Sequence, residues 1–253
     1  MNLGVSLDVA NLPEIPIMIN EYKHILKHVQ IYLDDSPFVE LHQQLRTILL
    51  DERISYSIHA PGSLNVANIS HYEDAIKIIN MASSINGIFV NLHVGFYESN
   101  KESHDKMFIQ AIKQIEKICE YAENKGVEIH IENGFETHDG ISHLGVTMSE
   151  WEILHNISQK NLYMCYDIGH ACIAFDDAFQ YRKFISRIGS FHIHNNDGIQ
   201  DFHLPFGTEG AICLTEVMRD LYETNKYLIL ENYFVDYKIA LDKVSTWHEK
   251  LIT

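Results

Sequence analysis

Val127-Glu128-Ile129-His130-Ile131-Glu132 shows most clearly how this chain is built. It is a short and mostly apolar run, typical of a buried β-strand, and it ends on a carboxylate. An ionisable group at the end of a buried strand is costly unless it is paired or binds a metal ion. Five other runs have the same form and end on His59, His93, Asp167, His194 and Glu231. Six strands that end in this way predict one shared polar site.

The chain contains eight strand-like runs separated by segments with helical periodicity. The strands are predicted at 2–7, 28–33, 54–59, 88–93, 127–132, 162–167, 188–194 and 227–231. Apolar residues recur at three- and four-residue steps in 73–85 and 105–122, and a last helix is predicted at about 236–252. This alternation predicts a (β/α)8 TIM barrel that forms a single domain over residues 1–253. A doubly wound open sheet is the alternative, but no glycine-rich phosphate loop follows the first strand.

Local signals mark several helix ends. Gly87 and Gly126 follow the two periodic segments, as glycine commonly does at a helix C-terminus. Thr147-Met148-Ser149-Glu150 has the spacing of a capping box and predicts a helix start.

The acidic balance argues against a broad nucleic-acid-binding surface. The formal net charge is −16, whereas such a surface normally needs a basic stripe. The four cysteines have no C-x-x-C spacing, which predicts the reduced thiols of a cytoplasmic protein. No apolar stretch approaches the ~18 residues of a membrane span. Sixteen histidines agree with metal chemistry, and the oligomeric state is left open.

The ionisable strand ends are suited to a metal site. In a (β/α)8 barrel the active site lies at the C-terminal ends of the strands, where the loops converge. Asp167 and His170 are three residues apart across a strand-to-loop turn, so both can reach one pocket. Asp201-Phe202-His203 offers a carboxylate and an imidazole from an extended loop. Mixed histidine and carboxylate ligands suit zinc, manganese, iron or cobalt better than calcium.

Seven short motifs in order resemble the xylose isomerase-like barrel superfamily, and most closely its endonuclease IV branch (AP endonuclease family 2). They extend over about residues 54–232, at matching strand ends. The motifs are His59-Ala60-Pro61, Asn91-Leu92-His93-Val94-Gly95, Ile131-Glu132-Asn133, Asp167-Ile168-Gly169-His170, His194-Asn195-Asn196-Asp197, Asp201-Phe202-His203 and Leu230-Glu231-Asn232.

The resemblance implies a set of nine metal ligands and one to three divalent ions per chain, with zinc or manganese favoured. Its first ion would be held by His59, His93 and Glu132. Its second would be held by Glu132, Asp167, His194 and Glu231, with Glu132 bridging. Its third would be held by His170, Asp201 and His203. His192 is expected to be structural or to face the substrate, rather than to bind metal.

The chain also departs from the DNA enzymes of this branch. Gly62 stands where they usually carry a tyrosine that enters the duplex. Basic residues are sparse in the strand-end loops, apart from Lys101, Lys106 and Arg182, although base flipping needs wedges and phosphate contacts. Duplex DNA is therefore not an expected partner.

The preferred prediction is a metal-dependent enzyme that isomerises or epimerises a sugar or sugar phosphate through an enediolate. The small-molecule enzymes of the superfamily hold their metal with four residues, which correspond to Glu132, Asp167, His194 and Glu231. Glu132 and Glu231 are the predicted catalytic acid and base. The alternative is a phosphodiesterase of the endonuclease IV kind, which would also need the third-metal residues. A barrel that binds a ligand for regulation is a third, non-enzymatic interpretation.

Overall fold

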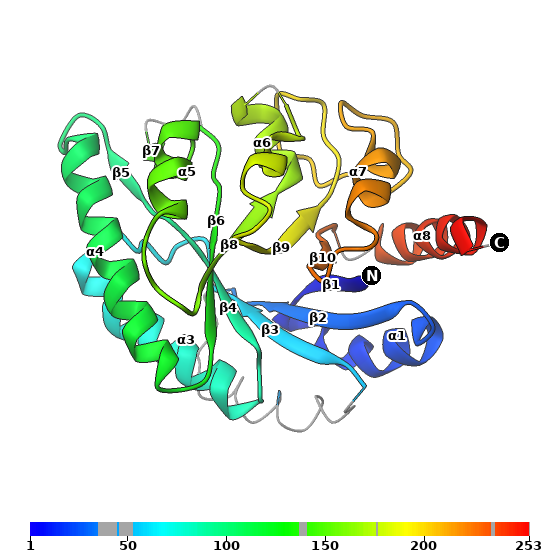
Figure 1. Ribbon diagram of the computed structural model, residues 1–253. Coiled ribbons are helices and arrows are strands. Elements are labelled where there is room, and N and C mark those ends of the chain that lie inside the picture. The colour runs from blue at the N-terminus through cyan, green and yellow to red at the C-terminus, as the bar shows by residue number, and fades with distance from the viewer. Residues whose placement is uncertain (35–44, 46–52, 137–140, 176, 234–235, 253) are drawn as a thin grey trace.

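Eight parallel strands close into a barrel in the computed structural model, which describes residues 1–253 except 35–44, 46–52, 137–140, 176, 234–235 and 253 (Figure 1). The strands pair in the order β1-β10-β9-β8-β6-β4-β3-β2, and β2 returns to β1. Their bounds are β1 Asn2–Asp8, β2 Leu26–Tyr32, β3 Ser55–His59, β4 Phe89–His93, β6 Glu128–Glu132, β8 Leu162–Asp167, β9 Ile188–Ile193 and β10 Tyr227–Leu230. Each lies at a predicted position, so the (β/α)8 TIM barrel is confirmed and the open sheet is wrong.

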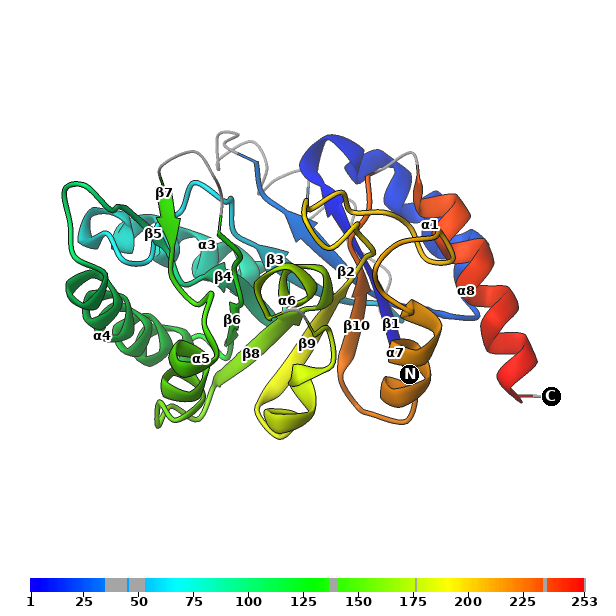
Figure 2. The same ribbon diagram turned by 90° about the horizontal axis from the view of Figure 1, so that it is seen from above.

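Helices surround the barrel on its outside (Figures 1 and 2). The α-helices are α1 Ile15–Tyr22, α3 Tyr72–Ser84, α4 His104–Glu123, α5 Met148–His155, α6 Ile168–Phe175, α7 Leu214–Leu221 and α8 Tyr237–Ile252. Three short 3-10 helices are η1 Val9–Glu14, η2 Ile69–His71 and η3 Gln180–Lys183. The segment between β2 and β3, where the alternating pattern predicts a helix, falls largely outside the described residues.

A two-stranded antiparallel sheet outside the barrel was not predicted. It pairs β5 (Phe96–Glu98) with β7 (Ile141–His143), which follow β4 and β6 in the chain. Strands of three residues are too short to show a recognisable alternation in sequence. Because each follows the C-terminal end of a barrel strand, this small sheet belongs to the same face as the predicted site.

The predicted helix ends are confirmed in part. Thr147 forms the full capping box with Glu150 at the start of α5, and Gly126 takes the left-handed conformation with φ 69° after α4. The prediction for α3 is wrong by one residue, because Asn86 adopts the left-handed conformation (φ 54°) instead of Gly87. Asparagine tolerates this region better than most residues because its side chain can bond locally.

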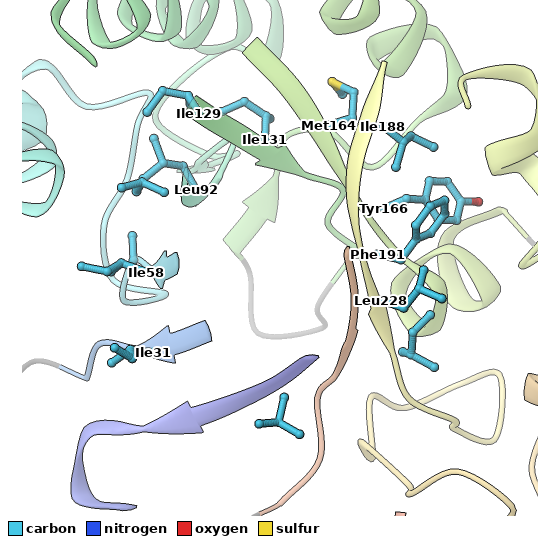
Figure 3. Close-up of a cluster of buried hydrophobic side chains, with 14 of the residues drawn as sticks. Ile31, Ile58, Leu92, Ile129, Ile131, Met164, Tyr166, Ile188, Phe191 and Leu228 are labelled. Atoms are coloured by element: carbon cyan, nitrogen blue, oxygen red, sulfur yellow. The ribbon is translucent and has the colours of Figure 1, made fainter. Parts of the chain in front are cut away.

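The apolar core lies between the strands and the helices, rather than inside the barrel. Side chains alternate along a strand, so every second residue points outward. Figure 3 shows this outward set from several strands, including Ile31, Ile58, Leu92, Ile131 and Phe191. Their exposed fractions are at most 1%.

The inward residues are mostly polar and meet across the barrel. In its lower part, His28 of β2 bonds Ser55 Oγ and Ser57 Oγ at 2.8 Å each, and His130 of β6 bonds Ser190 Oγ of β9 at 2.7 Å. The ring of Phe89 stacks on that of His130 at 3.8 Å between centroids. Burial lowers the pKa of His28 to about 3. A neutral polar layer therefore fills the barrel beneath the strand ends.

Candidate metal centre

The strand ends open into a cavity of about 420 Å³ at the C-terminal mouth of the barrel. Residues of β1, β2, β3, β4, β6, β7, α6 and α8, and of the loops that follow the strands, line it. They are Ser6, Asp8, Tyr32, His59, His93, Glu132, Gly134, Phe135, His143, His170, Asp201, His203, Glu231, Asn232, Tyr233 and Tyr237. Seven of the nine predicted ligands line this cavity, and the other two, Asp167 and His194, are buried.

One group of potential ligands lies at the centre of the mouth. Glu132, Asp167, His192 and Glu231 each offer one atom, and these atoms all lie within 4.8 Å of one another. His192 Nδ1 is 3.3 Å from Glu132 Oε1, 3.6 Å from Asp167 Oδ2 and 2.9 Å from Glu231 Oε2. Three carboxylates around one imidazole nitrogen form a donor set that suits zinc or manganese. We call these four residues the central group.

The structure puts His192 in the central group, where the sequence predicted His194. Both side chains point into the barrel because they are two residues apart. The register pairs His192 with Asp167, after a shift between Met164 and Cys165 of β8. His194 follows the C-terminal end of β9, and its Nε2 lies 3.0 Å from Asp167 Oδ1. His192, which was expected to be structural or to face the substrate, thus lies among the possible metal ligands.

His59 and His93 both approach Glu132, as the resemblance implies. His59 Nε2 lies 3.1 Å and His93 Nε2 3.5 Å from Glu132 Oε2. The same oxygen accepts a short hydrogen bond from Asn91 Nδ2. His59, Glu132 and His192 form a second possible ligand set within 4.8 Å. Glu132 is thus shared between two sets, which is the bridging position predicted for it.

The remaining predicted ligands come together on the other side of Asp167. His170, His194, Asp201 and His203 offer atoms that lie within 4.8 Å of one another. Asp201 Oδ2 is 3.3 Å from His170 Nε2 and 2.8 Å from His203 Nε2. We call these four residues the loop group. The prediction that the Asn195–Gly210 loop turns Asp201 and His203 inward beside His170 agrees with these distances.

Asparagine side chains shape the loop that carries this group. Asn195 Oδ1 accepts from the amide of Ile212 at 3.0 Å, and Asn195 Nδ2 donates to Thr208 O at 3.1 Å. His203 adopts φ 48°, a left-handed conformation that L residues rarely take. Its ring stacks on His194 at 4.2 Å between centroids. Backbone strain of this kind persists where the surroundings fix it, often at functional sites.

The electrostatics of both groups favour ionised carboxylates. Burial by itself raises the pKa of Glu132, but the charges of His192 and His93 outweigh it and hold the pKa well below its ordinary value. Burial likewise opposes ionisation of Glu231, and the charge of His192 lowers its pKa overall. Burial lowers the pKa of His203, yet its bond to Asp201 raises it to about 9.

The residues of both groups fit divalent cations. Several of their buried polar atoms have no hydrogen bond of acceptable geometry, namely both ring nitrogens of His192, His194 Nδ1, Asp201 Oδ1 and Glu231 Oε2. Buried polar atoms without such a bond are rare, and they are common at positions that bind an ion or water. A cation bound by each group would satisfy them with imidazole and carboxylate ligands, which transition metals accept.

A family model described as xylose isomerase-like TIM barrel matches residues 26–243. The chain belongs to this family. An uncharacterised protein of Methanocaldococcus jannaschii is 31% identical over 179 residues, which are 66% of this chain and 59% of that protein. A second uncharacterised protein of that organism is 27% identical over 194 residues, 72% of this chain and 73% of its own. This chain therefore spans about three fifths of the first relative's length.

Solved structures with the same fold include sugar epimerases. A D-tagatose 3-epimerase-like protein is 25% identical, with a TM-score of 0.78 over 98% of this chain and 97% of that chain. A 3-keto-D-glucoside 4-epimerase from E. coli shares the fold at 13% identity, with a TM-score of 0.74 over 98% of this chain and 99% of its own. The expected xylose isomerase-like superfamily is thus confirmed, and the solved neighbours are epimerases and isomerases.

Sequence reasoning missed Asp8, Tyr32 and Tyr237 at the site. Asp8 ends β1 and lines the cavity. From the sequence, this segment indicated only that no phosphate-binding loop follows the first strand. Tyr32 and Tyr237 also line it. The carboxylate at a strand end was the available signal for Asp8. In the part of the chain that the structure describes, no helix combines the length and apolarity of a membrane span.

Proposed function

We propose that this protein is a metal-dependent sugar isomerase or epimerase. The observation that carries the proposal is the convergence of Glu132 and Glu231 on the same nitrogen of His192, at 3.3 and 2.9 Å, beside an open cavity. Their side chains are 1% and 14% exposed, so both carboxylates are shielded from bulk water. The likeness to a D-tagatose 3-epimerase-like protein at 25% identity supports the same chemistry.

The two glutamates would exchange a proton with the carbon next to a carbonyl group. The pKa of each lies below its ordinary value, so each is a carboxylate at neutral pH and can accept the proton. One glutamate removes the proton and becomes protonated, so it can return that proton to the neighbouring carbon. Delivery to the opposite face of the same carbon would need the second glutamate, after it has taken up a proton from water. Return to the opposite face gives an epimer, and return to the neighbouring carbon gives an isomer. A divalent cation held by the central group would polarise the carbonyl and hydroxyl oxygens and lower the barrier to the enediolate.

Exchange of substrate hydrogen with solvent deuterium tests this proposal. Wild-type protein, purified without chelator and supplied with Zn²⁺ or Mn²⁺, should incorporate deuterium at a carbon adjacent to the carbonyl of a free ketohexose. Glu231→Gln should lower the exchange rate by about 10²- to 10⁴-fold, because it removes a general acid or base. Glu98→Gln is a matched control, since Glu98 is half-exposed on β5 and does not line the cavity. Normal exchange by Glu231→Gln would refute the assigned role.

Metal content measured on the same samples separates two explanations of a loss. Glu132→Gln should lower both metal occupancy and rate, because Glu132 lies in two ligand sets. A Glu231→Gln protein that keeps its metal but loses exchange supports a direct part in proton transfer. A Glu132→Gln protein with unchanged metal and unchanged exchange would make Glu132 merely structural.

A phosphodiesterase is the second candidate, and the loop group favours it. An isomerase can work without His170, Asp201 and His203 as ligands, whereas the hydrolase needs all three. The convergence of these three residues is therefore the observation that favours the phosphodiesterase. Incubation with duplex DNA containing an abasic site decides between the two, and we expect neither tight binding nor cleavage. Cleavage at the rate of a dedicated repair enzyme would promote the hydrolase.

A further inference from the structure

The side chain of Asn133 ties together the ends of two neighbouring barrel strands. The backbone pairing of β6 with β8 ends at Glu132 and Cys165, although β8 extends to Asp167. Asn133 Oδ1 accepts from the amide of Asp167 at 2.7 Å, and Asn133 Nδ2 donates to the carbonyl of Asp167 at 3.0 Å. A side-chain amide thus continues the ladder beyond the last backbone pair and holds both polar backbone groups of Asp167.

Asp167, which these bonds hold, lies between the two ligand groups. Its Oδ2 is 3.6 Å from His192 Nδ1 of the central group. Its Oδ1 is 3.0 Å from His194 Nε2 of the loop group, and it also accepts from the amide of His170 at 2.7 Å. A shift of the Asp167 backbone would therefore move donor atoms of both groups.

The backbone carbonyl of Asn133 orients a second ligand. It bonds His170 Nδ1 at 2.8 Å, and because a carbonyl can only accept, this nitrogen carries the proton. His170 Nε2 then faces Asp201 Oδ2 at 3.3 Å. His203 is held in the same way, with Nδ1 bonded to Glu231 O at 3.0 Å and Nε2 facing Asp201. Histidine ligands commonly donate one ring N–H to a carbonyl, which fixes the tautomer and leaves the other nitrogen for the metal.

A second asparagine shows what such bonds do when they serve only the fold. Asn161 Nδ2 donates to the carbonyls of Cys119 and Val127, at 3.0 and 3.2 Å. Asn161 directly precedes β8, so it lies at the opposite end of the barrel from the cavity. Its bonds join α4 to the start of β6. Asn133 is fully buried, and its bonds go instead to two of the predicted metal ligands.

We infer that Asn133 is a positioning residue shared by the central group and the loop group. Its side-chain amide holds Asp167 and its carbonyl holds His170, so donor atoms of both groups are in place before a cation binds. The inference rests on the proposed function in one respect, because it takes from that function the divalent cations that these groups would bind. It concerns cation binding alone and makes no assumption about the substrate.

Cation binding by chelator-treated full-length protein tests the inference. Asn133→Ala removes the side-chain amide and leaves the backbone carbonyl, so it releases Asp167. Calorimetry with Zn²⁺ should show affinity lowered by about 10- to 100-fold, the usual effect of losing a hydrogen bond that supports a metal ligand. Titration with Co²⁺, followed by its visible absorption, should show altered bands because these report the ligand geometry. Asn161→Ala is the matched control and should keep the wild-type affinity and spectrum.

Urea unfolding in excess chelator separates positioning from stability. Both substitutions should lower the unfolding midpoint of the metal-free protein, because each leaves buried backbone groups without a partner. Only Asn133→Ala should also lose cation affinity. Wild-type affinity and spectrum in Asn133→Ala would overturn the inference, and so would an equal loss of affinity in Asn161→Ala.

Asn133→Asp is a second variant for the case in which Asn133→Ala does not fold. It keeps the acceptor for the amide of Asp167 and removes the donor to its carbonyl. Its added negative charge would by itself strengthen cation binding. Weaker binding of Zn²⁺ therefore supports the positioning role, while equal or tighter binding overturns it.

The outcomes for this inference and for the proposed function are distinguishable. Weakened cation binding in Asn133→Ala supports the inference even if the wild type exchanges no substrate deuterium, a result that would sink only the proposed function. Normal deuterium exchange by the wild type, together with unchanged cation affinity in Asn133→Ala, overturns only the inference. A wild type that binds neither Zn²⁺ nor Co²⁺ overturns both.

Discussion

Replacement of His28 should change how the stability of the barrel depends on pH. His28 is fully buried in the lower barrel, where both ring nitrogens bond serine hydroxyls at 2.8 Å. Burial first, and then the charge of His130, lowers its pKa from 6.5 to about 3. Between these values the unfolded chain binds a proton that the folded protein does not. Stability is therefore complete above about pH 6.5 and is lost as the pH falls towards 3.

The two pKa values give the size of the effect. When the pH falls from about 7.5 to about 5, protonation of His28 in the unfolded chain alone lowers the free energy of unfolding by about 2 kcal/mol. His28→Phe removes this contribution and keeps a ring beside Phe89 and Tyr227, which lie 5.4 and 4.6 Å from His28 between centroids. It leaves the buried Ser57 hydroxyl without its His28 partner, which costs about 1–3 kcal/mol at any pH, whereas Ser55 Oγ still donates to Lys27 O at 3.2 Å. The variant is thus less stable at neutral pH but loses less on acidification.

Urea unfolding at both pH values, followed by circular dichroism, measures the difference. Excess chelator is present throughout, because metal binding depends on pH and would add its own slope. Ile31→Val is the matched control, since it trims a buried residue of the same strand and removes no titratable group. It should lower stability by about 0.5–1.5 kcal/mol equally at both pH values. A gap between wild type and His28→Phe that is the same at both pH values would refute the reasoning.

Three further substitutions test the site and one helix end. Gly169→Ala should reduce bound metal, measured by mass spectrometry, because an added Cβ would lie 2.0 Å from His194 Cε1; Gly62→Ala, whose nearest contact would be Tyr32 Oη at 3.5 Å, is the control, and equal metal contents would contradict the placement. Replacing both Asp201 and His203 with alanine should cause a large loss of metal stoichiometry or of catalytic efficiency, since they are two of the four loop-group ligands; wild-type values of both would leave the loop group without a function. Thr147→Ala should lower the free energy of unfolding by about 1 kcal/mol through loss of the capping box, and unchanged stability would contradict that role.

Side-chain alternation made most of the fold readable from sequence. Most barrel strands have apolar residues on one face and mainly polar or ionisable residues on the other, and the ends of six strands carry the predicted ligands. Alternation specifies which face a side chain occupies, because successive residues point to opposite sides. The ring of helices followed from the 3.6-residue period, and the start of α5 from the capping box.

Alternation does not determine how far along the barrel axis a side chain lies. His192 and His194 share a face, so the sequence could not decide which of them meets Glu132 and Glu231. The register shift between Met164 and Cys165 decides it by setting His192 beside Asp167. The sequence motif and the geometry thus select different histidines for the central group.

By itself, the sequence determined the barrel, the strand ends at its mouth and the types of ligand gathered there. These depend on hydrophobic period and on the cost of leaving charge in a buried strand, which are local properties of the chain. The tertiary structure alone decided that Asp8 of β1 faces the same cavity as Glu231, which follows β10, and that β5 pairs with β7. Barrel closure brings the first and last strands together, and such contacts depend on strand stagger and loop paths that no local pattern encodes.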